Sequence, residues 1–483
     1  MRQYVNQVIF NFSLVGLIVY STWLACLIAF GSKPRNYELE EQYQDQRTTV
    51  SWSIFQSVLM LYRIKPKHQK ASETPLFKRE LLAAMVMLSG FRQRIKKLVK
   101  PETVEESSIK SLIILVPAMN EEPVIKKTID GFLESTAYLP MVKMVIIDDG
   151  STDETANEVR QAITQYDCAD RVQLIQRFKP NAQTGKGDAL NWAYHRVVDQ
   201  EADPSRVVCG VLDADAYMRP IDYERVIKTF SQSPHLALLQ TRVKMVECHN
   251  LLQILQDVEF TVINNWIQNT RNKINNAAAS GNGQFIRASS VTRYDPWGNA
   301  LLEDFEFSTR FLLEGKETRY APDIVVYQEA VDKVKAFVRQ RTRWTQGGMD
   351  CLTGYWGRIL RNNHVGGLAK LEMSFYMLIP FTTILFGIAN LYVLGYVIAN
   401  LSQYWLLLIG LLMINYSIDL LICYNYLKIS QEEQTPQIYF ACILLILYNY
   451  ILYPAIIIAL CNKLRGITKW EKTTHGIQDQ IGN

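Results

Sequence analysis

Four long apolar stretches place the strongest constraint on how this chain folds. They are residues 8–30, 373–397, 404–427 and 438–461, and the only charged side chain in them is Asp419. A helix of about 20 such residues crosses the roughly 30 Å hydrocarbon core of a bilayer. Charged residues make up 20% of the chain, below the value of about 25% in typical soluble proteins. The sequence therefore predicts a membrane protein.

The first and third stretches carry further expectations. Residues 8–30 are too long for the apolar part of a secretory signal peptide and precede no small-residue cleavage site, so they are interpreted as a membrane anchor. A lone carboxylate such as Asp419 is costly in a bilayer and faces protein or water. It is expected to line a translocation channel, to lie near a helix end or to pair locally.

The chain between these apolar stretches divides into segments that differ in composition. Residues 38–108 mix apolar and basic side chains, which favours either an amphipathic helix on an anionic membrane surface or an ordinary core helix. The predicted segments are an N-terminal membrane anchor at 1–37, an interfacial region at 38–108, a soluble domain at 109–330, interfacial helices at 331–370, C-terminal membrane helices at 371–461 and a tail at 462–483.

Within the soluble domain, short apolar runs alternate with helix-like segments. The runs SLIILV, VKMVII, RVQLIQRF and RVVCGV are separated by stretches such as EPVIKKTIDGFLEST and DETANEVRQAITQY. This alternation predicts an α/β domain, with a mostly parallel sheet covered by helices on both faces. Ligands bind beyond the carboxyl ends of the strands in such sheets. Asp148, Asp149, Asp213 and Asp215 follow two of these runs, so we expect them to converge on one crevice.

Asp213 and Asp215 flank Ala214 at the end of a run that reads as a buried strand. Two carboxylates at this spacing repel each other unless a cation neutralises them. Mg2+ and Mn2+ accept such oxygen ligands and commonly keep substrate phosphates in their coordination shell. The alternative is a solvated turn, and a DDGS turn is likewise the alternative for Asp148 and Asp149.

Three other motifs carry chemistry. Lys186 lies between two glycines, where a flexible loop could bring its charge to a phosphate. Glu303 and Asp304 open an amphipathic helix, whose N-terminus favours acids in any case, and the functional interpretation makes one of them a general base. Gln340, Arg343 and Trp344 fall at helical spacing. An indole offers a flat surface for a sugar ring and a guanidinium a fork for phosphate, although an ordinary helix end at the membrane surface would also account for them.

Several function classes are disfavoured. The net charge of +4 is too small to indicate a nucleic-acid partner. The eight cysteines form no CxxC pair, which argues against zinc or a disulfide framework and fits a protein facing the cytosol. A phosphate-binding P-loop requires a glycine at position 180, where proline stands, so an ATP-driven transporter is not expected.

Taken in order, these motifs resemble those of the processive glycosyltransferases of family 2, which include cellulose, hyaluronan, chitin and bacterial poly-N-acetylglucosamine synthases. The matching residues are VPAMNEE, Asp148-Asp149-Gly150-Ser151, Asp213-Ala214-Asp215, Glu303-Asp304 and Gln340 to Trp344, spread over residues 109–348. The resemblance implies a GT-A domain inserted between transmembrane helices. It also implies a UDP-sugar donor, a growing polysaccharide acceptor and a Mn2+ or Mg2+ cofactor.

The resemblance also implies roles for individual residues. Donor binding falls to Asp148 and Asp149 at the uridine, and to Lys186, Asp213 and Arg343 at the nucleotide-sugar and its diphosphate. Asp213 and Asp215 hold the metal, and Asp304 is the general base. Acceptor binding falls to Glu303, Gln340 and Trp344. Trp470, Lys472 and Thr473 resemble a mobile loop that gates the donor site.

One segment departs from the cellulose synthases. Gly281, Asn282 and Gly283 stand where those enzymes carry a Cys-Gly-Ser acceptor motif. Two glycines permit close backbone approach, so this segment is expected to line the acceptor site, and a simple turn is the alternative. Cellulose itself becomes a less secure product, and the sugar is expected to be glucose or, second, N-acetylglucosamine.

The predicted function is a membrane-embedded inverting glycosyltransferase that polymerises a UDP-sugar into a β-linked polysaccharide and is coupled to its export. The alternatives are transfer of a single sugar to a lipid or short glycan, and a non-catalytic subunit of carbohydrate export. An accessory subunit or a homo-oligomer is compatible with either, and no nucleic acid is expected. The expected location is the plasma (inner) membrane, with the catalytic domain in the cytoplasm.

The predicted topology contains a conflict. Lysine and arginine are dense from residue 63 to residue 100, so the positive-inside rule puts the soluble domain in the cytoplasm. Three further crossings would then leave the basic tail outside. Either one apolar segment does not cross fully, with Pro454 as a candidate break, or residues 52–63 also cross.

Overall fold

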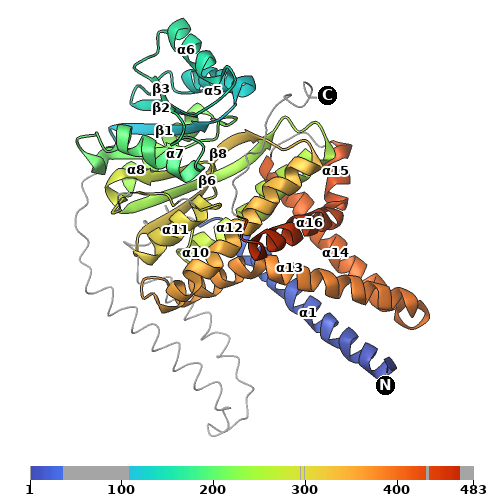
Figure 1. Ribbon diagram of the computed structural model, residues 1–483. Helices are drawn as coiled ribbons and strands as arrows, with labels where there is room; N and C mark the ends of the chain where they lie inside the picture. The colour runs from blue at the N-terminus through green and yellow to red at the C-terminus, as the bar shows by residue number, and fades with distance from the viewer. Residues whose placement is uncertain (1, 36–107, 294, 299, 431–434, 468–483) are drawn as a thin grey trace, which may run out of the picture. The chain divides into compact units, whose positions relative to one another are not determined.

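The computed structural model describes residues 2–35, 108–293, 295–298, 300–430 and 435–467 (Figure 1). The expected interfacial region at 38–108 and the expected gating residues Trp470, Lys472 and Thr473 lie outside the described residues. These two expectations therefore remain predictions.

The soluble domain contains an eight-stranded sheet and its covering helices. The strands are β1 (Ser111–Ala118), β2 (Val142–Asp149), β3 (Val172–Arg177), β4 (Val207–Val211), β5 (Tyr217–Met218), β6 (Leu236–Val246), β7 (Gln284–Arg287) and β8 (Glu317–Glu329). The helices are α5 (Glu122–Ser135), α6 (Thr155–Tyr166), α7 (Lys186–Ala193), α8 (Pro220–Gln232), α9 (Leu251–Val258), the π-helix η3 (Glu259–Asn264), α10 (Asn265–Lys273) and α11 (Glu303–Leu313).

The strand order is β3-β2-β1-β4-β7-β6-β8-β5. The first four strands pair in parallel, as the alternation of runs and helices predicted. Strand β7 then pairs antiparallel with both β4 and β6, so the sheet as a whole is mixed. The predicted α/β class is confirmed, and the strands that sequence did not indicate, β5 to β8, extend the sheet on one side.

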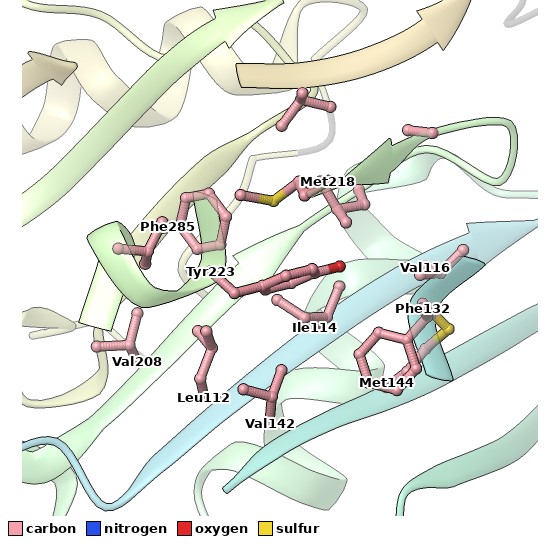
Figure 2. Close-up of a cluster of buried hydrophobic side chains, with 14 of the residues drawn as sticks. Leu112, Ile114, Val116, Phe132, Val142, Met144, Val208, Met218, Tyr223 and Phe285 are labelled. Atoms are coloured by element: carbon pink, nitrogen blue, oxygen red, sulfur yellow. The ribbon is translucent and has the colours of Figure 1, made fainter. Parts of the chain in front are cut away.

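Both faces of the sheet are buried, which explains why its first strands read as unbroken apolar runs. Alternate residues of a strand point to opposite faces. Leu112, Ile114 and Val116 of β1 pack toward α5 and α8, where Phe132 and Tyr223 meet them (Figure 2). The intervening residues of β1 pack on the other face, against α7 and α11.

The C-terminal third is helical, and two of the predicted apolar segments are each one continuous helix, while their crossing of a membrane stays a prediction. The helices are α12 (Val334–Arg361), α13 (Gly367–Ala399), α14 (Leu401–Ser430), α15 (Pro436–Ile443) and α16 (Leu445–Leu464). Among the described residues, three helices are long and apolar enough to cross a membrane, namely Gly367–Ala399, Leu401–Ser430 and Leu447–Leu464. The predicted anchor is a single helix, α1 (Arg2–Gly31), and its crossing stays a prediction.

The last apolar stretch differs from its prediction. It is two helices, because the chain bends at Leu444, where φ is −89° and ψ is 0°. Pro454, the expected break, lies inside α16 without ending it. Proline within an apolar helix is tolerated where neighbouring helices support the turn it weakens.

Helix α16 lies alongside α12 for most of its length (Figure 1). Near its start, Tyr448 approaches Arg341, and further on the carbonyl of Ala455 accepts a hydrogen bond of 3.3 Å from Thr342 Oγ1. Near its end, Lys463 pairs with Asp350. The two helices therefore form one packed unit.

Candidate active site

One part of the candidate site lies where β2 ends. Asp149 is buried and accepts a 2.9 Å hydrogen bond from Arg177 Nη1. Burial raises the pKa of Asp149, and the Arg177 charge works in the opposite direction. Asp148 is buried too, but Ser151 N and Gln176 Nε2 hold its oxygens at 2.9 and 2.8 Å. Asp149 lines a cavity that is described below, and Asp148 is not among the residues that line it.

Lys186 is the first residue of α7, so it is held by a helix and is not in a flexible loop as expected. Its Nζ lies 2.6 Å from Asp213 Oδ1 and 4.0 Å from Glu303 Oε1. Burial works to lower the pKa of Lys186, but the charges of Asp213 and Glu303 outweigh it and the pKa is raised. A partly buried cation thus lies beside the first aspartate of the Asp213-Ala214-Asp215 motif.

The segment Gly281-Asn282-Gly283 joins the aspartate motif to the acidic helix. Gly281 and Gly283 have φ values of +81° and +69°, which favour glycine. Asn282 is buried, and its Oδ1 accepts from the backbone N–H of Asp213 at 3.2 Å. A Cβ added at Gly281 would lie 3.3 Å from Asp304 Oδ2. The close approach expected from the two glycines is therefore present, and it faces Asp304.

Asp304 lies in the first turn of α11, as predicted, and is only 7% exposed. Its Oδ1 accepts a 2.7 Å hydrogen bond from the backbone N–H of Phe305. Burial, reinforced by the charge of Glu303, raises the pKa of Asp304 to about 7. A carboxyl group with this pKa can accept or release a proton near neutral pH.

The remaining predicted residues lie on α12. Gln340, Arg343 and Trp344 are partly buried and line the same cavity as Asp304. The Phe260 ring meets the Trp344 ring edge-on, with 6.2 Å between centroids. The intervening Arg341, which sequence did not single out, is buried against the Trp344 ring.

A single cavity of about 470 Å³ collects these residues. Its polar lining includes Asp149, Lys186, Asp213, Asp215, Asp304 and Trp344. It continues to α13 and α16, where its lining is mainly apolar and includes Met377, Ile379, Pro380, Leu452 and Ile456. Asp419 is not among the residues that line it.

Asp213 and Asp215 are compatible with a divalent cation. Both are partly buried at the cavity wall, on either side of buried Ala214. Within the described part of the chain, no group of three or more His, Cys, Asp or Glu side chains is placed to hold a metal. A Mg2+ ion nevertheless commonly takes only one or two ligands from protein carboxylates, and substrate phosphates and water complete its coordination shell. The donor set therefore fits a cation that arrives with a phosphorylated substrate.

Comparison with known proteins shows which proteins this chain is similar to. Residues 110–347 match the model of a family described as "Glycosyltransferase like family 2". A β-monoglucosyldiacylglycerol synthase of Nostoc sp. is 26% identical over 275 residues, which cover 56% of each chain. A poly-β-1,6-N-acetyl-D-glucosamine synthase of Staphylococcus epidermidis is 24% identical over 260 residues, covering 53% of this chain and 59% of that one.

The chain thus spans a little over half the length of these relatives. Among solved structures, the mannosyltransferase PcManGT of Pyrobaculum calidifontis, in complex with GDP-Man and Mn2+, aligns with a TM-score of 0.49 at 17% identity. The alignment covers 78% of this chain and 94% of that one.

Proposed function

We propose, from the premise that residues 110–347 form a family 2 glycosyltransferase domain of GT-A fold, that this protein transfers a sugar from a UDP-sugar to an acceptor hydroxyl with inversion. One observation carries the proposal. A single cavity brings the Lys186–Asp213 pair, the buried Asp304 carboxyl and the Trp344 ring together. In the proposed reaction, Lys186 binds the phosphates, Asp304 acts as the base, and the Trp344 ring stacks on a sugar.

Each residue has a distinct part in the proposed reaction. Asp304 takes the proton of the acceptor hydroxyl as its oxygen forms the new bond to the anomeric carbon. The bond from that carbon to the diphosphate breaks, and UDP leaves with the electron pair. Lys186 and Arg343 stabilise the negative charge that develops on the diphosphate. Attack opposite the leaving group converts an α-linked donor into a β-linked product.

A Mn2+ or Mg2+ ion is part of the proposal, and Asp213 and Asp215 would hold it. When bound, such an ion neutralises the diphosphate charge of the donor. By their names, the relatives include a synthase of a glycolipid and a synthase of a glycan. The donor sugar of this chain is therefore a proposal, and so is its use of a metal ion.

The pKa of Asp304 predicts a pH dependence. Because the base acts only when it is deprotonated, the transfer rate should rise with pH through about 7 and level off above it. Charged or titratable groups near Asp304 are Glu303 on its own helix and Lys186, Cys351 and Tyr376 on neighbouring helices. The check is kcat/KM from about pH 6 to about pH 8, and a flat profile would contradict the assignment.

For the acceptor, we propose a growing β-linked glycan, with glucose as the first expected unit and N-acetylglucosamine as the second. Gln340 and Trp344 line the same cavity and would hold the acceptor sugar. A second candidate is transfer of one sugar to a lipid. It is favoured by the apolar lining of the cavity between α13 and α16, two candidate membrane spans that would give a lipid direct access.

Trp344→Ala tests the glycan proposal. Loss of the indole should reduce high-molecular-weight product about tenfold or more, because stacking of the acceptor sugar on the ring is lost, while the amount of folded protein stays close to normal. Product size distribution and protein yield are measured together. Unchanged polymer output would remove Trp344 from the acceptor site.

The function itself is tested by UDP release from the purified, detergent-solubilised full chain, with Mn2+ or Mg2+ and one UDP-sugar at a time. Release with one donor, together with polymer, supports the glycan proposal. Release without polymer, but with a glycolipid when lipids are added, supports the second candidate. No release with any UDP-sugar from well-folded protein would refute the proposal as stated.

We further propose that the protein is a multi-pass protein of the plasma membrane with the domain at 110–347 in the cytoplasm, where UDP-sugars are available. The three apolar helices of the C-terminal region support membrane association.

A further inference from the structure

A largely buried polar cluster lies beside Trp344, with two of its members on the wall of the same cavity, and joins three elements that are distant in the sequence. Arg341 of α12 donates from Nη1 and Nη2 to the two carboxylate oxygens of Glu259 in η3, both at 2.8 Å. The hydroxyl of Tyr448 in α16 donates to Glu259 Oε2 at 2.5 Å. We refer to Arg341, Glu259 and Tyr448 as the Arg341 cluster.

The guanidinium of Arg341 also stacks on aromatic rings. Its central carbon lies 4.5 Å from the centroid of the Trp344 ring and 4.8 Å from that of Phe337. Phe260, which follows Glu259 in the chain, contacts the Trp344 indole edge-on and restricts the movement of the indole from a second direction. Arg341 and its partners therefore hold one side of the Trp344 ring, while Trp344 is only partly buried and lines the cavity.

The chemistry of this cluster is specific to arginine. A planar guanidinium can form a two-pronged pair with a carboxylate and at the same time lie flat on an aromatic ring, and a lysine ammonium cannot do both. A buried charge is tolerated only when it is paired, so Glu259 fixes where the guanidinium lies. Tyr448 in turn fixes one oxygen of Glu259. The orientation of Trp344 is thus tied to a helix of the membrane region.

We propose that Arg341 is a positioning residue for the acceptor, which sets the plane of the Trp344 ring and depends on Glu259 and Tyr448 to do so. The inference rests on the proposed function only in assigning the acceptor to the Trp344 ring. It does not depend on which sugar is transferred. Arg341 itself carries no part of the bond-making chemistry, which distinguishes it from Arg343.

The test compares Arg341→Lys and Tyr448→Phe with Arg339→Lys, a control on the exposed side of the same helix. The first measurement is the KM for an oligosaccharide acceptor, cello- or chito-, matched to the donor that wild type uses. We expect the acceptor KM to rise about tenfold in Arg341→Lys and less in Tyr448→Phe. The donor KM and the slow hydrolysis of donor by water should stay unchanged, and Arg339→Lys should match wild type.

The second measurement needs no turnover. Iodide quenching of Trp344 fluorescence is obtained as the difference between each protein and its Trp344→Phe counterpart. We expect quenching to increase in Arg341→Lys and Tyr448→Phe, because the ring is less firmly held. If wild type releases no UDP, the proposed function fails and this measurement alone decides the inference.

Three results would overturn the inference. One is an unchanged acceptor KM in Arg341→Lys in a protein that turns over. Another is unchanged quenching of Trp344 in both variants. The last is an equal fall in donor hydrolysis and acceptor transfer together with a lower melting temperature, which would show that the cluster supports the fold and does not position the acceptor.

Discussion

Asp304→Asn is expected to lower the rate of sugar transfer by about 10³-fold while leaving UDP binding nearly intact. The amide has almost the same shape as the carboxyl group, so it can still accept the 2.7 Å hydrogen bond from Phe305 N. It cannot take a proton from the acceptor hydroxyl. Transfer is measured as acceptor-dependent UDP release, and binding by UDP titration of the purified protein.

Glu303→Gln is the matched control for this prediction. Glu303 precedes Asp304 in α11 but is partly exposed, and its carboxylate lies 4.0 Å from Lys186. A smaller loss in Glu303→Gln than in Asp304→Asn would support Asp304 as the base. The reverse order would transfer that role to Glu303, and full turnover in Asp304→Asn would remove Asp304 from the mechanism.

Removal of divalent metal is expected to reduce transfer to background, and added Mn2+ or Mg2+ should restore it. Without the ion, the donor diphosphate and the carboxylates of Asp213 and Asp215 would bring like charges together. Asp213→Asn and Asp215→Asn should each lower transfer by about 10²-fold to 10³-fold at saturating metal. UDP release is measured with EDTA and then with excess metal.

Asp170→Asn serves as the control, because Asp170 is an exposed aspartate outside the cavity lining. It should behave as wild type at every metal concentration. Full activity in excess EDTA would instead show that Lys186 and Arg343 suffice to stabilise the leaving group.

The parts of the fold that sequence predicted are those with a strong local pattern. Strands β1, β2 and β4 were found because nearly all of their residues are buried, which leaves mainly apolar runs. Strand β3 is less buried and alternates polar with apolar residues. Strands β5 and β7 were missed because they have only two and four residues. Lys186 was expected in a loop because it stands between glycines, yet those glycines allow a tight entry into α7.

The candidate site shows the same division. The acidic motifs and the α12 motif are compact in sequence, so their members could be named in advance, and most of them line one cavity. The sequence does not show which of Asp148 and Asp149 lines the cavity. Neighbouring residues of a strand point to opposite faces, and only the structure shows that Asp149 is the one that meets the cavity. The pairing of Arg341 with Glu259 joins residues 82 positions apart, and no local pattern marks it.

The pairing of α16 with α12 bears on the number of bilayer crossings. Lys335, Arg339 and Arg361 are exposed on α12, and exposed charges of this kind do not remain in hydrocarbon. Although α16 is long and apolar enough to cross a membrane, we infer that it stays at the depth of α12, because it is fastened to α12 at Arg341 and again at Asp350. If α13 and α14 each cross once, the crossings after residue 347 are then even in number. An even number agrees with the charge rule for the basic C-terminal sequence, which a third crossing would break.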